Sequence, residues 1–510
     1  MSKLSDILKK IFHWLFFALS LFLFVCSVFV TATHEKYENG GVQEFAKVTV
    51  NNIPFTILLL VIGIIIMFVL LFLFSRIEKK INVEMFAIGI SALAFLLSVI
   101  WINILCIVPG SDQELCVRYA DAINSGKYSS LERCGYLSNY PHLLGLVAIL
   151  RFLFKVFGEG NYQAFRYFNA FCVPLLIYSG YRITKKISED NKSAELFYLI
   201  SMLFCIPVYG YVLYVYGDLG GPSFGMLAFW MFLESLDSNK AGWKAGLFIG
   251  AVMTIVLRKS NAIFLMAMAV VLLLRFMKKI KKNDIINLAI LIVSAVFAIE
   301  CVNWPYLPHK VNPDYAVPVT ANIAMGLNYD YGYAGWYNYY ELDVMERNGS
   351  IAAEASKEAE DVIKETLSIY LMNPKLGVDF FFNKINSQWQ SPLYQSIVSN
   401  NLLYGGQNDF VMSVFFGKIG DFFETFMKMY QMMFYGCIAF LLWNRRKSCV
   451  KPEHYTAMIA VFGGFLLSLV WESKGRYIFP YFLIMIPAFS AGAESCYLEL
   501  KNMANKKKKN

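Results

Sequence analysis

The stretch ISALAFLLSVIWINILCIV, residues 90–108, runs directly into PGSDQELCVRYADAINSGKYSS, residues 109–130. The first part is almost wholly apolar and has about the length, roughly 20 residues, that a helix needs to cross a bilayer. The second part carries Asp112, Glu114 and Asp121 in quick succession. We therefore predict a membrane helix that leads into a charged loop and places acidic side chains at the rim of the bilayer.

The composition of the whole chain is typical of a membrane protein. Of its 510 residues, 57% are hydrophobic and only 16% are charged, whereas soluble domains carry roughly 25% charged residues. Apolar runs lie at about 11–31, 54–74, 84–108, 164–183, 195–215, 222–238, 243–257, 261–277, 284–303, 426–444, 453–471 and 477–495. We predict an all-α polytopic membrane protein with about twelve transmembrane helices.

The positive charges predict the topology. Lysines and arginines collect in MSKLSDILKK, SRIEKKIN, YRITKKISEDNKS, RFMKKIKKND, NRRKSCVK and KNMANKKKKN. Cytoplasmic loops are enriched in these residues, so both termini are expected inside. The net charge of +9 is then a topological signal and not a sign of nucleic-acid binding. The wealth of Lys, Ile, Asn and Phe is typical of a low-GC bacterium, and we place the chain in its plasma (cytoplasmic) membrane.

One apolar segment, PHLLGLVAILRFLFKVF at 141–157, is expected to lie along the outer surface. If it crossed the membrane, YRITKKISED would fall outside. It also carries Arg151 and Lys155 one helical turn apart, which suits an interfacial helix. The whole of 109–163 then forms one extracytoplasmic loop.

These assignments divide the chain into four parts. They are an N-terminal membrane hairpin (1–83), a membrane core with the outer loop 109–163 (84–303), a second outer domain (304–425), and C-terminal membrane helices with a basic cytoplasmic tail (426–510). The outer domain contains a predicted amphipathic helix, IAAEASKEAEDVIKETLSIYLMN, and a Tyr-rich stretch, GLNYDYGYAGWYNYY. The aromatic side chains of that stretch suit interfacial packing or sugar stacking. Because long ordered loops usually carry function, the active site is expected on the outer face.

The sequence lacks the usual motifs for metal clusters and for nucleotide binding. The ten cysteines show no C-x-x-C spacing and the five histidines no helical pairing, so no metal cluster is predicted. Cys116 and Cys134 share the first outer loop and are close enough in sequence to form a disulfide. The chain has no phosphate-binding loop, no G-x-G-x-x-G and no G-x-S-x-G elbow, which argues against nucleotide hydrolysis.

The order of motifs around the first outer loop resembles a known class. Asp112 with Glu114 is followed by YADA (119–122), Pro141, Phe157-Gly158 and Arg166. This order resembles the GT-C class of membrane glycosyltransferases that use polyprenyl-phosphate sugars. Protein O-mannosyltransferases and the bacterial lipid A aminoarabinose transferase belong to that class. One departure is that two membrane runs precede 84–108, where members typically have one.

Two further stretches supply cations and complete the predicted site. In VLRKSN (256–261), Arg258 and Lys259 either snorkel or clamp a lipid phosphate. In WESKGRYIFPYFLIMIP (471–487), an arginine at membrane depth needs an anionic partner, either Glu472 or a phosphate. The predicted set for substrate and lipid phosphate is Arg258, Lys259, Arg476, Tyr477, Glu472, Arg166 and His142. His142 suits a cap at the start of the surface helix equally well.

The resemblance implies the activity. Asp112 would act as general base, and Glu114 would position it or share a divalent metal with it, although both residues also suit a polar helix cap. Asp218, in the turn YVYGDLGGPS, and Asp121 are alternative bases. We expect an inverting transfer from a polyprenyl-phosphate-linked sugar to a glycan, lipid or protein acceptor, with no cofactor beyond that metal. The alternatives are a polysaccharide polymerase and a lipid-linked glycan transporter or flippase.

Overall fold

The N-terminal region is a helical hairpin with a β-ribbon between its helices. The computed structural model describes residues 2–36, 42–105, 107–330, 332–397, 409–446 and 451–507. Helix α1 (Ser2–Phe29) leads into strands β1 (Val30–Lys36) and β2 (Val42–Val50), which pair antiparallel with Val30 opposite Val50. The Asn52 side chain accepts a hydrogen bond from the Phe55 N–H at the start of α2 (Ile53–Ile77), as N-terminal caps do. The predicted membrane hairpin 1–83 therefore also carries a β-ribbon that the sequence did not predict.

Residues 109–163, called the first outer segment after their predicted location, fold as short helices after α3 (Val83–Leu105), and 304–425 are called the second outer segment on the same basis. They are α4 (Asp112–Asn124), α5 (Tyr136–Asn139) and α6 (Leu144–Phe157). With 14 residues, α6 is about 21 Å long, which is less than the roughly 30 Å of a hydrocarbon core. Its Arg151 donates to Asn124 Oδ1 at 3.1 Å and to the Pro305 carbonyl at 2.6 Å. This length and these contacts agree with the expected surface helix, whose position against a membrane stays a prediction.

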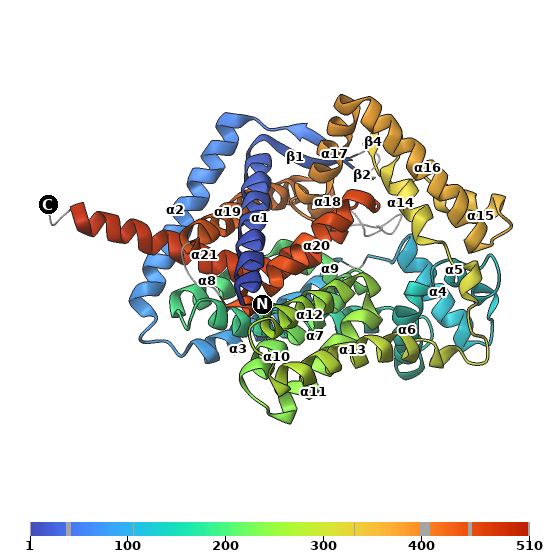
Figure 1. The fold of residues 1–510 in the computed structure, drawn as a ribbon, viewed down its shortest axis with the longest axis horizontal. Helices are drawn as coiled ribbons and strands as arrows, with labels where there is room; N and C mark the ends of the chain where they lie inside the picture. Colours follow the sequence, from blue (N-terminus) through green and yellow to red (C-terminus); the bar gives the residue numbers. More distant parts are fainter. Residues whose placement is uncertain are drawn as a thin grey trace.

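The core consists of packed helices from the middle and the end of the chain. They are α7 (Gln163–Ile187), α8 (Lys192–Leu203), α9 (Ile206–Val212), α10 (Gly217–Asp237), α11 (Ala241–Leu257), α12 (Ala262–Phe276), α13 (Lys282–Cys301), α19 (Lys418–Arg445), α20 (Thr456–Val470) and α21 (Phe479–Lys507). Helix α21 has 83% of its apolar window buried, against 28% for α2. Residues 472–476, which lead into α21, are buried as well, and Figure 1 shows α21 among α8, α19 and α1.

The number of membrane spans differs from the predicted one. All twelve predicted runs lie in helices, but seven of the described helices are long and apolar enough to cross a membrane, namely α1, α2, α3, α12, α13, α20 and α21, or up to nine spans if each bent pair counts as one. The run 195–215 is split between α8 and α9 by a bend of 47°. Among the remaining runs, 243–257 lies in a shorter apolar helix, α11.

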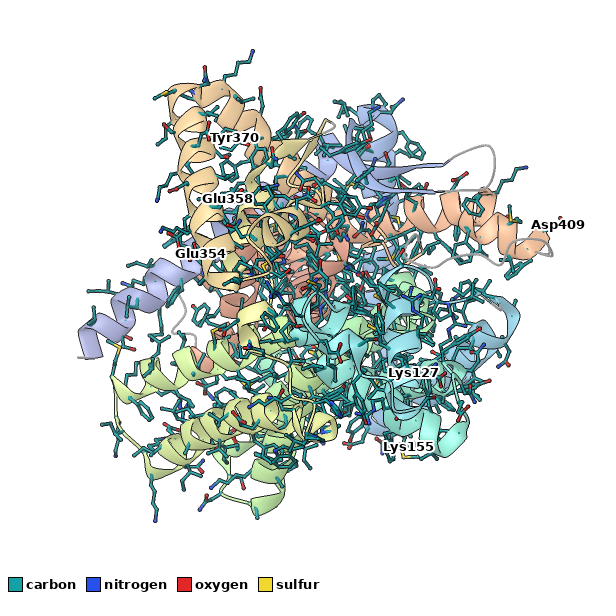
Figure 2. The ribbon with its side chains drawn as sticks, turned by 90° about the vertical axis from the view of Figure 1, so that its right-hand side faces the viewer. Lys127, Lys155, Glu354, Glu358, Tyr370 and Asp409 are labelled. Carbon is teal, nitrogen blue, oxygen red and sulfur yellow. The ribbon has the colours of Figure 1, made fainter. Side chains whose placement is uncertain are left out.

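The second outer segment is helical, as predicted. It comprises α14 (Val319–Leu327), a small ribbon of β3 (Tyr329–Asp330) and β4 (Tyr333–Ala334), α15 (Tyr340–Arg347), α16 (Ala352–Met372), α17 (Pro374–Trp389) and α18 (Asp409–Phe415). Helix α16 confirms the predicted amphipathic helix. Figure 1 shows α14–α17 on the same side of the molecule as α4–α6, and Figure 2 views that side, with Glu354, Glu358 and Tyr370 along α16 and Lys127 and Lys155 on the first segment.

Candidate active site

Asp112 and Arg476 form an ion pair between the first outer segment and the entry to the last helix. Asp112 Oδ2 lies 3.3 Å from Arg476 Nη2, 364 residues away, and Tyr136 donates a hydrogen bond of 3.1 Å to Asp112 Oδ1. Burial alone would raise the pKa of Asp112. The positive charges of Arg476 and Lys474 lower it by more, so the pKa lies below its usual value. Both carboxylate oxygens thus contact side chains from other elements, which is more than a helix cap requires, and the carboxylate is ionised at neutral pH.

Arg476 is buried among polar and aromatic groups. Its Nη1 donates to the Tyr214 hydroxyl at 2.5 Å, and its backbone N–H donates to Gln395 Oε1 at 3.1 Å. The guanidinium lies 5.5 Å from the ring centroid of Tyr216 and 5.3 Å from that of Tyr477. Glu472, one of the two predicted partners of Arg476, does not fill that role in the structure; Asp112 does.

Glu472 instead binds Lys474, a residue that the sequence reasoning missed. Lys474 Nζ lies 2.9 Å from Glu472 Oε1 and 3.4 Å from Glu44 Oε1, and Tyr477 donates to Glu472 Oε2 at 2.6 Å. Burial lowers the pKa of Lys474, but Glu472 and Glu44 outweigh this effect and hold the pKa above its usual value. The signal was available, because Lys474 stands between Glu472 and Arg476 in the same outer turn.

Arg258 pairs with Asp218, the first alternative base. The guanidinium forms an ion pair with the fully buried carboxylate of Asp218 and lies 5.3 Å from the Tyr477 ring centroid. A Cβ on Gly217 would meet the Leu257 carbonyl oxygen at 1.9 Å, so this approach of α10 to the end of α11 needs glycine. Asp218 therefore neutralises Arg258, while the neighbouring Lys259 is exposed.

The structure does not bring Glu114 or Asp121 into contact with Asp112. Glu114 follows Asp112 by two positions on α4 and is exposed, and residues so spaced point to different sides of a helix. Asp121 lies at the far end of α4. His142, in contrast, lies close enough to Asp112, Arg258, Lys259 and Arg476 for their charges to act on its pKa, and its ring is 6.0 Å from that of Tyr140.

Arg166 has a structural role and not the predicted phosphate-binding one. It is fully buried and donates to the carbonyls of Leu213 at 2.9 Å and Ile107 at 2.7 Å. These bonds tie the start of α7 to the chain after α3 and to the end of α9.

The predicted metal pair and the considered disulfide are not formed. Because Asp112 and Glu114 face different sides of α4, they do not make a joint ligand set, and no group of three or more His, Cys, Asp or Glu residues in the described chain could hold a metal ion. Cys116 is a buried thiol, and Cys134 Sγ lies 3.1 Å from Ser350 Oγ.

Two tyrosines, Tyr136 and Tyr140, connect Asp112 to the buried carboxylate of Glu341. The ring centroids of Tyr136 and Tyr140 are 5.1 Å apart, and Tyr140 donates a hydrogen bond of 3.0 Å to Glu341 Oε1. Burial raises the pKa of Glu341 to about 7. The sequence reasoning missed Glu341, since a glutamate at the start of an ordinary amphipathic helix gives no signal. We call Asp112, Arg258, Lys474 and Arg476, with their partner carboxylates, the charged site.

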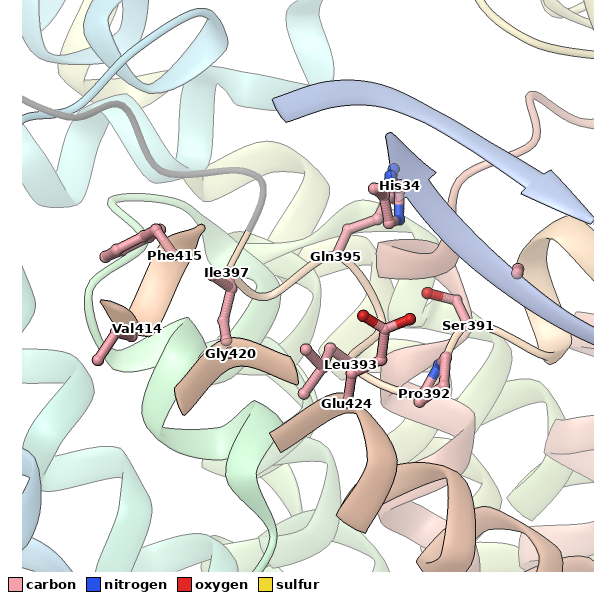
Figure 3. A pocket seen from close by; sticks show the side chains of 11 residues that line it. His34, Ser391, Pro392, Leu393, Gln395, Ile397, Val414, Phe415, Gly420 and Glu424 are labelled. Atoms are coloured by element: carbon pink, nitrogen blue, oxygen red, sulfur yellow. The ribbon is translucent and has the colours of Figure 1, made fainter. Parts of the chain in front are cut away.

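Figure 3 shows a small pocket of the protein with its lining side chains. It has a volume of about 40 Å³ and includes His34, Gln395 and Glu424 in its lining. Gln395 also accepts the hydrogen bond from the Arg476 N–H at 3.1 Å. A cavity of this size holds a few water molecules at most, so it is not a sugar-binding cleft.

The helices and the charged site define a polytopic membrane protein in which an ion pair joins α4 to the entry of the last helix. No protein-family model and no curated protein matches the sequence. Among solved structures, the oligosaccharyltransferase of Archaeoglobus fulgidus resembles the chain distantly. Its apo form matches with 14% identity and a TM-score of 0.41 over 82% of this chain and 52% of that one.

Two further structures of the same archaeal enzyme match in the same way. The form tethered to an acceptor peptide gives 14% identity and a TM-score of 0.42, over 80% of this chain and 49% of that one. The complex with an inhibitory peptide and a dolichol-phosphate gives 14% identity and a TM-score of 0.43, over 82% of this chain and 52% of that one. The chain spans about half the length of these proteins, and a likeness at this level carries no argument about its activity.

Proposed function

We propose that this chain is a GT-C-like membrane glycosyltransferase that moves a sugar from a polyprenyl-phosphate donor to an acceptor on the extracytoplasmic face. The observation that carries the proposal is the contact of 3.3 Å between Asp112 and Arg476, since a carboxylate is able to accept a proton and the guanidinium beside it is able to bind a phosphate. The motif order that resembles the GT-C class supports it independently. Both residues lie outside the helices that could cross a membrane, where the reacting end of a lipid-linked sugar would be.

The reaction is a single displacement. An acceptor hydroxyl oxygen attacks the anomeric carbon of the sugar, and the bond between that carbon and the phosphate oxygen breaks. The electron pair leaves with the polyprenyl phosphate, and the hydroxyl proton passes to Asp112. Attack from the side opposite the leaving group inverts the anomeric centre, and no nucleotide is needed because the phosphate is already a good leaving group.

The ion pair between Asp112 and Arg476 gives the donor phosphate a second role, which is to make Asp112 a stronger base. Arg476 lowers the pKa of Asp112 in the protein as described, which makes its carboxylate a weak base. A donor phosphate attracts Arg476 in turn, because phosphate and carboxylate compete for the same planar guanidinium. Binding of the donor thus loosens the hold of Arg476 on Asp112 and raises the basicity of that carboxylate when the acceptor needs it.

The exposed Lys259 and the buried Arg258 complete the proposed phosphate side. Arg258 reaches the ring of Tyr477 from one element and Arg476 reaches it from another, each at 5.3 Å. Two guanidinium groups, each paired with one carboxylate, thus contact the same tyrosine ring. Lys259 lies next to Arg258 and is exposed, so that it can contact a phosphate without first giving up a buried partner.

The test combines genetics with mass spectrometry. Cell-envelope glycans, lipid-linked glycans and glycoproteins are compared between cells with the gene, cells without it, and cells that carry only the Asp112→Asn form. We expect one glycan or glycoprotein to lose a single sugar in both altered strains, with the unmodified acceptor accumulating. Identical profiles in all three strains would overturn the proposal, whereas loss of whole repeat polymers with intact units would favour a polymerase.

A further inference from the structure

The β-ribbon of the N-terminal hairpin reaches the charged site. Glu44 on β2 lies 3.4 Å from Lys474 Nζ through its Oε1. The neighbouring Phe45 stacks on Tyr333 with ring centroids 4.8 Å apart and meets Trp336 edge-on at 5.0 Å. Figure 1 shows the ribbon beside α17 and β4. The β-ribbon between the two N-terminal helices therefore contacts the charged site directly.

The side-chain amide of Gln395 links the ribbon to the backbone of segment 471–477. Gln395 Nε2 donates to the Glu44 carbonyl at 3.1 Å, and Gln395 Oε1 accepts from the Arg476 N–H at 3.1 Å. On the other strand, the Ala32 N–H donates to the Gln390 carbonyl at 2.9 Å. These bonds hold the ribbon against segment 471–477, so the position of Glu44 beside Lys474 is built into the fold.

Lys474 is shared unequally between its two carboxylates. Glu472 is buried, with a side-chain exposure of 8%, and its oxygens lie 2.9 Å from Lys474 and 2.6 Å from the Tyr477 hydroxyl. Glu44 keeps a side-chain exposure of 50% and lies 3.4 Å away. Glu472 is locked by two partners, whereas Glu44 can turn into solvent without leaving a charge buried. Of the two, Glu44 is the one that an incoming anion would displace.

We infer that Lys474 is a further phosphate-binding residue and that Glu44 is its displaceable counter-ion, an inference that rests on the proposed polyprenyl-phosphate donor. An ammonium group has three N–H donors, so Lys474 can keep Glu472 and bind a phosphate oxygen in the place of Glu44. While Glu44 is bound, two carboxylates face one ammonium and repel a phosphate. When Glu44 leaves, Lys474 can donate to a phosphate oxygen near Asp112, whose pKa Lys474 already lowers.

The test measures binding of farnesyl phosphate, a short polyprenyl phosphate, to the full-length protein in detergent. Glu44→Gln keeps the size of the side chain but removes the competing charge, and exposed ion pairs contribute little. We therefore expect about 1.5- to 5-fold tighter binding. Lys474→Met should weaken binding, and the double variant Glu44→Gln/Lys474→Met should bind like Lys474→Met alone. Glu354→Gln, an exposed carboxylate on α16, serves as the matched control and should bind like the wild type.

The outcomes separate this inference from the proposed function. Weaker or unchanged binding by Glu44→Gln overturns the inference, and so does an equal gain in the Lys474→Met background, because the gain must act through Lys474. The Glu44→Gln arm decides on its own if Lys474→Met fails to fold. If the wild type does not bind farnesyl phosphate, or binds it no better than the Arg476→Ala form does, the proposed donor site itself is wrong.

Discussion

The hydroxyl of Tyr140 donates a hydrogen bond of 3.0 Å to Glu341 Oε1, which joins the two outer segments across 201 residues. The Tyr140 ring lies 5.1 Å from that of Tyr136, whose hydroxyl binds Asp112. A continuous set of contacts thus connects the proposed base to the second outer segment. Glu341 is a positioning residue in this arrangement, and its protonation state affects how firmly the two segments are joined.

Replacing Glu341 by Gln should stabilise the protein at alkaline pH. Burial raises the pKa of Glu341 from 4.5 to about 7, so the folded protein holds a proton that the unfolded chain has released. The resulting loss in the free energy of unfolding is absent below about pH 4.5, grows as the pH rises to about 7, and is constant above that. Since one pKa unit corresponds to about 1.4 kcal/mol, the gain should approach roughly 3 kcal/mol.

The measurement is the thermal midpoint in detergent at pH 5 and pH 8. The thermal midpoint of Glu341→Gln should lie above that of the wild type at pH 8, with a much smaller difference at pH 5. The control Glu346→Gln replaces an exposed carboxylate on the same helix and should show no such trend. An equal effect of Glu341→Gln at both pH values would show that Glu341 does not titrate in this range.

Asp112→Asn should abolish sugar transfer and leave the protein folded. Asn keeps the size of the side chain and can still accept from Tyr136, but it cannot take a proton. General base catalysis contributes roughly 10²- to 10⁴-fold, so turnover should fall by about that factor while farnesyl phosphate still binds. Asp121→Asn, on the same helix, is the matched control. Equal losses in both variants, or transfer near normal by Asp112→Asn, would remove Asp112 from the chemistry.

Arg476→Ala and Lys259→Ala should differ in their pH profiles. Both remove a proposed phosphate contact and should weaken farnesyl phosphate binding. Arg476 also lowers the pKa of Asp112, so its loss should move the acid limb of the transfer rate to higher pH, because Asp112 acts only when ionised. Lys259→Ala should leave that limb in place, and a shift of the same size in both variants would contradict the assigned roles.

Asp218→Asn should destabilise the protein without removing the base. The change leaves the buried Arg258 without its ionic partner, and breaking a buried pair costs roughly 3–5 kcal/mol. Asp237→Asn, at the exposed end of the same helix, should cost far less. Thermal melts measure the difference, and any Asp218→Asn protein that remains folded should still transfer sugar at low temperature. A stable but inactive Asp218→Asn protein would make Asp218 the better candidate for the base.

Both outer segments should be labelled from outside intact cells. Lys127 and Glu354 are exposed on the first and second segments (Figure 2), so cysteines at these positions should react with a membrane-impermeant maleimide. The experiment uses a Cys134→Ser background, because Cys134 is itself exposed. Labelling of either position only after permeabilisation would place that segment inside and separate the two halves of the site.

The sequence alone was enough to predict the helical membrane class and the helix at 352–372, which the structure confirms, while the outer location of 109–163 and 304–425 stays a prediction. These features follow from local periodicity, hydropathy and charge placement, which neighbouring residues specify. It also supplied Asp112, Arg258 and Arg476 as candidates, since each breaks a local rule by placing charge at the end of an apolar run.

Which of these charges meet follows only from the folded structure. Arg476 faces Asp112 and not Glu472, Arg258 faces Asp218, and Lys474 lies between Glu472 and Glu44. The partners come from segments as far apart in the chain as Glu44 and Lys474, a separation of 430 residues (474 − 44). Ion pairing depends on the distance between atoms and on burial, and neither is encoded in spacing along the chain. The same reason explains why Glu341 and the β-ribbon could not be predicted as parts of the site.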